Sequence, residues 1–219
     1  MEETKGVLWD MDGVLISTGE FHWRAWSKTF SERGIPFTQE QFRATFGMNN
    51  TGIIKRLLGE TTARDLIAEI SATKERLFRE AVKGHARLLP GVQGWLDRLQ
   101  DWGVGQAIAS SAPPANIDAL VDELGIRCYF AAIVSGADLP GKPDPAVFLE
   151  AARLLGVSPE GCVVVEDAVA GVEAAKRGGM KCVAVTTTNP AHKLSDADVV
   201  VERLDALPAD EFSRLLFQR

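Results

Sequence analysis

The chain of 219 residues is 46% hydrophobic and 25% charged, a globular composition that supports a sizeable core and excludes wholesale disorder. Its length fits one large domain, or a core domain that carries a smaller insert. The formal net charge of −6 argues against nucleic acid as a partner, because neutralising backbone phosphates requires clustered lysine and arginine. An acidic protein that binds an anionic substrate must instead reverse the field locally, with a metal ion, a lysine or backbone amides.

The cysteines and the hydropathy pattern narrow the class further. Cys128, Cys162 and Cys182 are far apart and odd in number, so they suggest no disulfide framework. Cys162 and Cys182 lie in apolar runs and are expected in the core, since a zinc site would need clustered ligands. No stretch is apolar enough to span a bilayer, and the N-terminus does not resemble a secretory signal. We therefore expect a cytoplasmic protein with no membrane partner, present as a monomer or weak dimer.

The first predicted element in chain order is a buried strand at residues 6–9, which ends in Asp10. The stretch that follows it contains no convincing strand and reads as helices at residues 21–33, 39–46, 51–58 and 62–82. The last of these helices has an apolar side made of Leu66, Ile70, Leu77 and Ala81. We predict a helical cap domain at residues 16–85, inserted into a core domain made of residues 1–15 and 86–219.

Strand and helix alternate in the rest of the chain. Apolar runs that read as strands lie at residues 104–109, 131–134, 162–165, 181–185 and 198–201. Helical patterns lie between them at residues 90–102, 145–155 and 168–177. The runs do not alternate polar and apolar residues, which is typical of strands buried on both faces of a parallel sheet. The predicted class is α/β, with a Rossmann-like, doubly wound parallel sheet as the core and an inserted helical cap.

Asp10 and Asp12 end the first strand in the segment DMDGV. Two carboxylates two residues apart at a strand end can face the same pocket, and a cation such as Mg²⁺ would relieve their repulsion. Asp10 could then attack phosphorus, while Asp12 protonates the leaving oxygen and later deprotonates a water. Gly13 would allow the backbone to turn tightly beside the phosphate. Taken alone, however, such a pair more often marks a solvated acidic turn.

Polar residues also follow other predicted strands, and the carboxyl ends of parallel strands meet in one crevice. Ser110 and Ser111 follow residues 104–109, where they could bind phosphate oxygens or form a polar turn. Lys142, between glycine and proline in GKPDP, could face a phosphate or the solvent. Glu166 and Asp167 follow residues 162–165 and could hold a metal ion or cap the next helix.

Four segments, in this order, resemble the four motifs of the haloacid dehalogenase superfamily: WDMDGVL, AIASS, GKPDP and VVVEDAVAGVEAAKRGGM. The resemblance covers essentially the whole chain, and the helical insert is similar to the cap of the β-phosphoglucomutase-like subfamily, which includes mutases and small-molecule phosphatases. It implies that Asp10 is the nucleophile and Asp12 the acid/base. The implied phosphate ligands are Ser110, Ser111 and Lys142. The implied Mg²⁺ site comprises Asp10, Asp12 through its backbone carbonyl, Asp167, and Glu166 near it.

Two cap residues resemble substrate-side positions of this subfamily. His22 lies in HWRAW, similar to the motif that begins the first cap helix, so we expect a role in substrate contact or cap closure rather than a surface position. Asn50 lies in the segment GMNN, either a substrate-reading loop or a simple turn. Mutases carry an arginine in this loop to grip a second phosphate, and Asn50 cannot replace it. Ser17 occupies a position where relatives often have aspartate, which affects the hinge more than the chemistry.

We expect a Mg²⁺-dependent phosphatase that hydrolyses small phosphomonoesters, such as sugar phosphates, through an aspartyl-phosphate. The alternative enzyme is a sugar-phosphate mutase of the β-phosphoglucomutase type. A non-catalytic sensor of a phosphorylated metabolite would be free to lose one of the motif residues, and none is lost. A dehalogenase would need neither Asp12 nor Asp167. His85 and His192 have no partners in the sequence and are expected at the surface.

Overall fold

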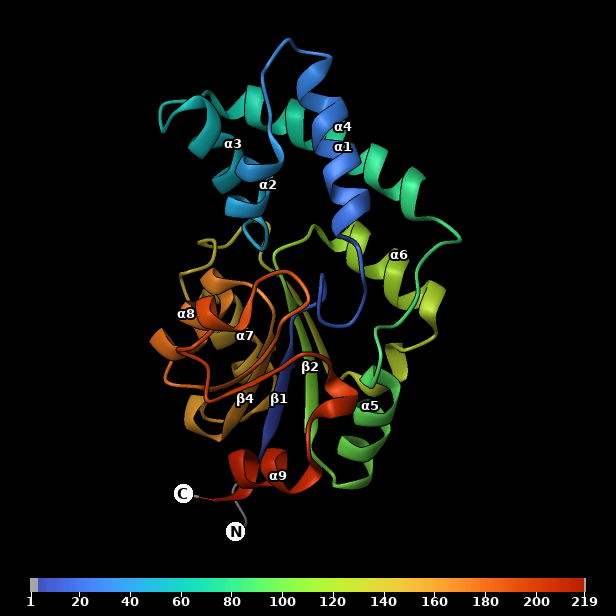
Figure 1. The fold of residues 1–219 in the computed structure, drawn as a ribbon, viewed down its shortest axis with the longest axis vertical. Helices are drawn as coiled ribbons and strands as arrows, with labels where there is room; N and C mark the ends of the chain where they lie inside the picture. The colour runs from blue at the N-terminus through green and yellow to red at the C-terminus, as the bar shows by residue number, and fades with distance from the viewer. Residues whose placement is uncertain (1–3, 219) are drawn as a thin grey trace.

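The computed structural model describes residues 4–218, and within them the core is a six-stranded parallel sheet in the order β3-β2-β1-β4-β5-β6 (Figure 1). The strands are β1 (Gly6–Trp9), β2 (Gly105–Ser110), β3 (Ala132–Ser135), β4 (Cys162–Glu166), β5 (Lys181–Val185) and β6 (Val199–Val201). β1 lies at the centre, where Leu8 aligns with Ala107 of β2 and Val164 of β4. The predicted α/β class and the parallel sheet are confirmed.

Helices cover both faces of this sheet, which explains the continuous apolar runs of its strands. One face packs against α5 (Val92–Asp101), α6 (Pro114–Leu124) and α9 (Ala209–Phe217), and the other against α7 (Ala146–Leu155) and α8 (Val169–Arg177). Alternate residues of β1 serve the two layers, since Val7 and Trp9 join the first core and Leu8 joins the second. Cys162 and Cys182 are buried in the second core, as predicted. Short 3-10 turns occupy Arg127–Tyr129, Pro159–Gly161, Ala191–Lys193 and Leu204–Ala206.

A helical unit stands above the carboxyl ends of the strands (Figure 1). It consists of α1 (Gly19–Ser31), α2 (Gln39–Thr45), α3 (Asn50–Leu58) and α4 (Arg64–Val82). The unit has an apolar core of its own, formed by Trp26, Phe30, Ile53, Ile54, Ile67 and Ile70. The two connections to the sheet run side by side, because Ile16 forms an antiparallel bridge with Leu88 and the N–H of Leu89 donates to the carbonyl of Leu15.

The structure corrects the sequence-based elements in two places. Helices α6 and α9 were not predicted. The predicted apolar side of α4 is wrong at Leu66, which is 40% exposed, whereas Ile70 is buried and the half-buried Leu77 packs against the first core. The side that is buried consists of Ile67, Ile70, Lys74, Glu75, Phe78 and Val82. This side was not predicted because a lysine and a glutamate lie at its centre and interrupt the apolar periodicity.

None of the described helices combines the length and the apolar character that crossing a membrane requires. His85 and His192 are exposed, as predicted. The cytoplasmic location and the domain boundaries expected from the sequence stay predictions.

Candidate active site

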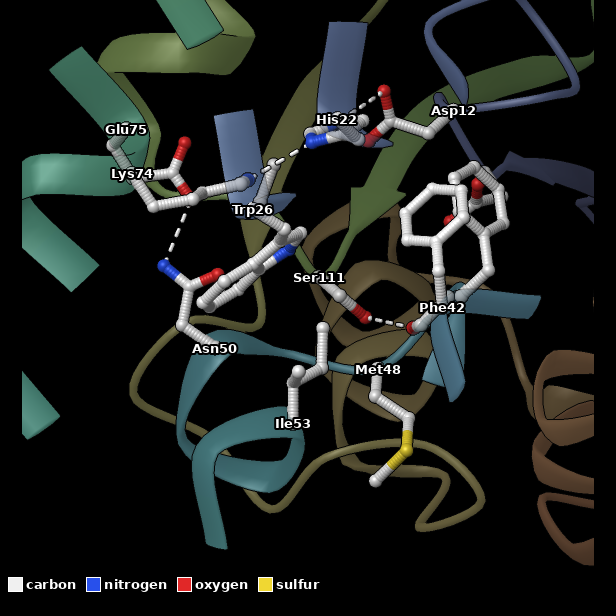
Figure 2. Close-up of a pocket in the computed structure, with 14 residues that line it drawn as sticks. Asp12, His22, Trp26, Phe42, Met48, Asn50, Ile53, Lys74, Glu75 and Ser111 are labelled. Atoms are coloured by element: carbon white, nitrogen blue, oxygen red, sulfur yellow. Dashed lines mark hydrogen bonds and ion pairs between the residues drawn. The ribbon is translucent and has the colours of Figure 1, made fainter. Parts of the chain in front are cut away.

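A small cavity of about 40 Å³ lies between the strand ends and the helical unit (Figure 2). Asp10, Asp12, Ser111 and Ala112 line it from the sheet. The helical unit contributes His22, Trp26, Phe42, Phe46, Gly47, Met48, Asn50, Ile53, Lys74 and Glu75. Ligand pockets usually measure several hundred Å³, so this volume describes a closed state that must open to admit a small molecule.

Asp10 forms the floor of the site together with a buried lysine. Nζ of Lys142 lies 2.6 Å from Oδ1 of Asp10 and 2.7 Å from Oε1 of Glu166, and over the ring of Phe148 at 4.6 Å from its centre. Burial would lower the pKa of Lys142, but the two carboxylates outweigh burial and raise it, so the lysine stays charged. Burial raises the pKa of Asp10 to about 7, with Glu166 and Asp12 adding to the shift and Lys142 opposing it.

Glu166 is fully buried, and both of its carboxylate oxygens have partners. Oε1 accepts from the ammonium of Lys142, and Oε2 accepts from the N–H groups of Asp167 and Ala168 at 2.7 Å each. The carboxylate also fills the space beside Gly171, where a Cβ atom would fall 1.8 Å from Oε1. Glu166 therefore holds Lys142 and the start of α8, and it does not line the cavity.

Asp167 lies against the turn that follows β1. A Cβ atom on Gly13, whose φ is +87°, would fall 1.9 Å from Oδ2 of Asp167. The Thr188 hydroxyl donates to this same oxygen, and the side-chain amide of Asn189 donates to the Asp167 carbonyl at 3.1 Å. Burial, followed by the charges of Glu166 and Asp10, raises the pKa of Asp167 well above its usual range. The site thus brings together carboxylates that repel one another.

The donor atoms at this site are carboxylate and carbonyl oxygens, which are the ligands that Mg²⁺ prefers. Within residues 4–218, no three His, Cys, Asp or Glu side chains are placed to share one ion. Mg²⁺ needs only one or two carboxylates, because it keeps several waters in its shell. Asp10 and Asp167 each have one oxygen engaged by a side chain, Lys142 and Thr188 respectively, which leaves the other oxygen for a ligand. The residues therefore fit Mg²⁺, with a narrower carboxylate set than the sequence analysis predicted.

Asp12 has an environment opposite to that of Asp10. Its Oδ1 accepts from the Thr18 hydroxyl and lies 3.1 Å from Nε2 of His22. Although burial alone would raise the pKa of Asp12, His22 and Thr18 hold it below the usual value. Ser17 is exposed, and its neighbour Thr18 makes the contact to the acid/base candidate.

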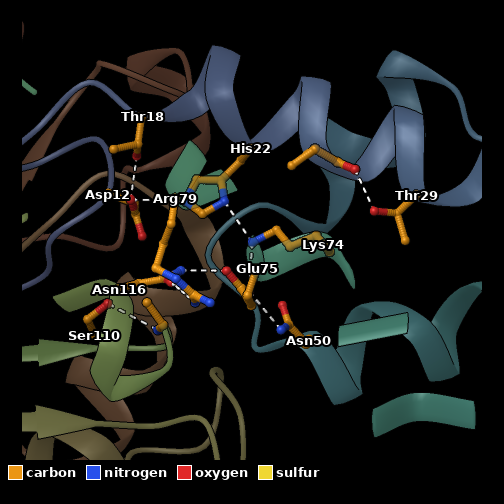
Figure 3. Close-up of polar contacts among 12 residues, drawn as sticks. Asp12, Thr18, His22, Thr29, Asn50, Lys74, Glu75, Arg79, Ser110 and Asn116 are labelled. Carbon is orange, nitrogen blue, oxygen red and sulfur yellow. Dashed lines mark hydrogen bonds and ion pairs between the residues drawn. The ribbon is translucent and has the colours of Figure 1, made fainter. Parts of the chain in front are cut away.

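A chain of polar contacts continues from His22 into the helical unit (Figure 3). The His22 ring stacks on Phe78 with 4.0 Å between ring centres, and its Nδ1 lies 2.9 Å from Nζ of Lys74. Lys74 in turn lies 2.8 Å from Oε1 of Glu75, which also accepts from the side-chain amide of Asn50. Asn50 and His22 both line the cavity, as do Lys74 and Glu75, which the sequence pattern did not indicate.

The predicted phosphate ligands lie in different places. Ser111 lines the cavity and donates from its hydroxyl to the carbonyl of Gly47 at 2.8 Å. Ser110 is buried, and its hydroxyl accepts from the N–H of Ala112. Lys142 contacts Asp10 but does not itself line the cavity. Of the three, Ser111 is the residue that the closed cavity exposes.

Comparison with known proteins gives matches along nearly all of the chain. Residues 4–179 match the family described as haloacid dehalogenase-like hydrolase. The β-phosphoglucomutase of Bacillus subtilis (strain 168) is 33% identical over 211 residues, which cover 93% of this chain and 91% of that protein. The chloroplastic 5-amino-6-(5-phospho-D-ribitylamino)uracil phosphatase of Arabidopsis thaliana is 32% identical over 96% of this chain, which spans only 57% of that longer protein. The structure of CbbY from Rhodobacter sphaeroides in complex with xylulose-(1,5)bisphosphate superimposes with a TM-score of 0.81 at 27% identity, covering 92% of this chain and 95% of CbbY.

Proposed function

The chain belongs to the haloacid dehalogenase-like hydrolase family, and we propose that it is a Mg²⁺-dependent phosphatase of small phosphomonoesters, such as sugar phosphates. The observation that carries this proposal is the pair of carboxylates in one closed cavity. The pKa of Asp10 is raised to about 7, and that of Asp12 is lowered. Without a cation these shifts disfavour the charged form of Asp10, whereas Lys142 at 2.6 Å, and Mg²⁺ when bound there, favour the carboxylate that a nucleophile requires. The phosphatase-named relative supports the same reaction class.

In the proposed reaction Asp10 is the nucleophile. Its carboxylate oxygen bonds to phosphorus, the bond from phosphorus to the ester oxygen breaks, and the leaving oxygen takes a proton from Asp12. Asp12 can carry this proton because a bound phosphate dianion beside it raises its pKa. A water then attacks the aspartyl-phosphate, Asp12 accepts a proton from that water, and the Asp10 carboxylate leaves phosphorus. His22 and Thr18 hold Asp12 in position for both steps.

The remaining residues balance charge and hold the phosphoryl group. We infer that Ser110, Ser111 and Lys142 serve the phosphoryl group, Ser110 by shaping the turn and Ser111 by direct contact. Asp10, Asp167 and the Asp12 backbone carbonyl would hold Mg²⁺, while Glu166 positions Lys142. Mg²⁺, when bound there, would neutralise the carboxylates that otherwise repel the substrate.

The helical unit corresponds to the cap in this proposal, with the cap domain at residues 16–85 and the core domain at residues 1–15 and 86–219. The closed cavity of about 40 Å³ supports a cycle in which the cap opens to admit the substrate and closes to exclude bulk water. His22 would link closure to chemistry, because it comes from α1 of the cap and contacts Asp12 of the core.

A sugar-phosphate mutase is the second candidate, and two observations favour it. A β-phosphoglucomutase is among the relatives, and Lys74 brings into the cavity a cation that could take the place of the mutase arginine. The two reactions share the aspartyl-phosphate and differ in the acceptor, which is water for the phosphatase and a sugar hydroxyl for the mutase.

The deciding experiment measures phosphate release and isomerisation side by side. The purified enzyme with Mg²⁺ is offered a panel of phosphorylated metabolites, and β-glucose 1-phosphate with a trace of the 1,6-bisphosphate. Phosphate release without isomerisation supports the phosphatase, whereas glucose 6-phosphate with little free phosphate supports the mutase. Asp10→Asn should lose at least about a thousandfold in rate and remain folded. Asp118→Asn, on an exposed side chain of α6, is the matched control, and activity of Asp10→Asn within tenfold of wild type would overturn the mechanism.

A further inference from the structure

The cavity wall contains a buried ion pair that the proposed chemistry does not use. Lys74 and Glu75, both from α4, lie 2.8 Å apart, and their side chains are 3% and 7% exposed (Figure 2). Among the described residues that line the cavity, Lys74 is the sole lysine or arginine, and His22 is the other basic group. Within this cavity, a second anionic group of a substrate would therefore depend on Lys74 for its charge balance.

Glu75 is held as a carboxylate by several donors. Oε1 accepts from Lys74 and from the Asn50 side-chain amide at 2.8 Å, and Oε2 accepts from the side-chain amide of Asn116 (Figure 3). Arg79 completes the arrangement by donating to the carbonyl oxygen of the Asn116 side chain at 2.9 Å. Burial alone would raise the pKa of Glu75, but Lys74 and His22 lower it, so the group remains anionic. These contacts come from α3, α4 and α6 and fix the carboxylate in place.

This arrangement leaves the cap side of the cavity without a free positive charge. The ammonium of Lys74 is shared between Glu75 and His22, and its remaining neighbours are the rings of Trp26 and Phe78. Replacing an ion pair by hydrophobic residues often costs nothing in stability, so stability alone does not account for a buried pair at this wall.

We propose that Glu75 determines the specificity of this site: by occupying Lys74, it excludes substrates with a second phosphate and selects phosphomonoesters whose alcohol part is uncharged and polar. The proposal rests on the phosphatase function proposed above and names its substrate class. A second phosphate at this wall would meet the carboxylates of Glu75 and Asp12, and like charges brought together in a binding site cost several kcal/mol.

The rest of the wall suits an uncharged alcohol with hydroxyl groups. Its apolar part consists of Trp26, Phe42, Phe46, Met48 and Ile53. Asn50 and Glu75 provide the polar part, and a substrate hydroxyl can donate to the remaining lone pair on Oε2 of Glu75, which among the described residues accepts only from Asn116. A sugar or polyol, with apolar C–H faces and hydroxyl edges, has this combination of surfaces.

The test uses two ligands that differ only in the second phosphate, glucose 6-phosphate and glucose 1,6-bisphosphate. Binding is measured by calorimetry in an Asp10→Asn background with Mg²⁺ present, so that turnover does not enter. Glu75→Gln removes the charge and keeps the shape, and Glu75→Met serves if the amide disturbs Asn116. Glu80→Gln is the matched control, since it is the same substitution on the same helix at a side chain that is 61% exposed.

With Glu75 in place, the monophosphate should bind at least about tenfold more tightly than the bisphosphate. Glu75→Gln should shift this ratio toward the bisphosphate by about tenfold or more, and Glu80→Gln should leave it unchanged. The proposal is overturned if the protein with Glu75 binds the bisphosphate at least as well, or if a folded Glu75 variant leaves the ratio unchanged. If neither variant folds, the ratio measured with Glu75 present decides alone. Failure to hydrolyse any monoester would instead overturn the phosphatase function. The binding measurement is independent of that result, because it does not depend on turnover.

Discussion

Gly47 of the cap lies so close to Ala168 of the core that a Cβ atom on Gly47 would fall 2.9 Å from the Cβ of Ala168. The φ of Gly47 is +86°, and its carbonyl accepts from Ser111, so the backbone itself closes the edge of the cavity. Gly47→Ala should therefore hinder closure and lower kcat/KM by about ten- to a hundredfold, because small misplacements of a closing element are costly in catalysis.

Gly34→Ala is the matched control for this prediction. Gly34 also has a positive φ, +64°, but a Cβ atom there has no neighbour within 4 Å. Both variants place an alanine at a positive φ, which costs roughly 1–2 kcal/mol, and only Gly47→Ala also meets the core. Equal activities for the two variants, measured as phosphate release, would show that the contact with Ala168 does not matter.

Asn49 joins the cap to the core through one side chain. Its Oδ1 caps α3 by accepting from the N–H of Gly52, while its Nδ2 donates to the carbonyls of Gly136 and Leu139. Asn49→Asp should keep the helix cap and lose both contacts to the core, weakening the closed state by about 1–3 kcal/mol. Hydrogen exchange near residues 16 and 85 should rise, and a metal fluoride that mimics phosphate should suppress it less than in the wild type.

Thr38→Ala tests whether the effect of Asn49→Asp comes only from weakening a helix in the cap. Thr38 caps α2 by accepting from the N–H of Gln41, so its loss weakens one cap helix at an exposed position. Hydrogen exchange of the Thr38→Ala variant near residues 16 and 85 should remain that of the wild type. The proposed motion of the cap is wrong if Asn49→Asp also exchanges like the wild type there, with and without the fluoride.

Asp167 and Glu166 should respond differently to mutation, although they are neighbours. Asp167→Asn should raise the Mg²⁺ concentration for half-maximal activity by at least about tenfold, because a carboxylate ligand is lost. Glu166→Gln should leave that concentration nearly unchanged and instead lower stability by about 1–3 kcal/mol, because its amide group meets the donors of Asp167 and Ala168. Titrations of activity with Mg²⁺, together with thermal melts, separate the two effects. A larger shift in Mg²⁺ requirement for Glu166→Gln would reverse the assignment.

Mg²⁺ should stabilise the protein in a manner that depends on pH. The pKa of Asp10 is raised from 3.8 to about 7, and that of Asp167 is raised as well, so protons compete with the metal ion below neutral pH. Without Mg²⁺, these two groups contribute less to the free energy of unfolding as the pH rises toward 7, because the folded state disfavours their charged forms. The increase in Tm on adding Mg²⁺ should therefore be large near pH 8 and small near pH 5. An equal increase at both pH values, or one that Asp167→Asn retains, would contradict the proposed ligands.

The strands were predictable because both faces of the sheet are covered, so each strand is a continuous apolar run. The ends of β1, β2 and β4 then placed Asp10, Ser110 and Glu166 near one another. The orientation of Glu166 was not predictable. It depends on Lys142, which is distant in the sequence, and on two backbone N–H groups, whose positions a sequence pattern does not indicate. The adjacency of Glu166 to Asp167 suggested a shared metal site, but their carboxylates serve different partners.

The pair Lys74 and Glu75 shows where periodicity arguments reach their limit. Charged residues in a helix normally mark its exposed side, and the predicted apolar side therefore named neither of these two. Their partners are His22 of α1, Asn50 of α3 and Asn116 of α6, which meet only after the helices pack. A helix that is apolar at Ile67, Ile70, Phe78 and Val82 but charged at the position between them is the signal that could have indicated a polar cavity.

The bridge between Ile16 and Leu88 has a consequence for how such a protein can vary. Since the chain leaves and rejoins the sheet at paired residues, the ends of the insert are held together whatever its length, and changing that length adds little loop-closure entropy. An exchange of the insert would leave the alignment of Trp9 with Ile108 and Val165 intact. The fold thus separates the sheet, which carries the reacting groups, from the helical insert, which contacts the rest of the substrate. Replacing the insert can change the substrate while the reacting groups stay in place.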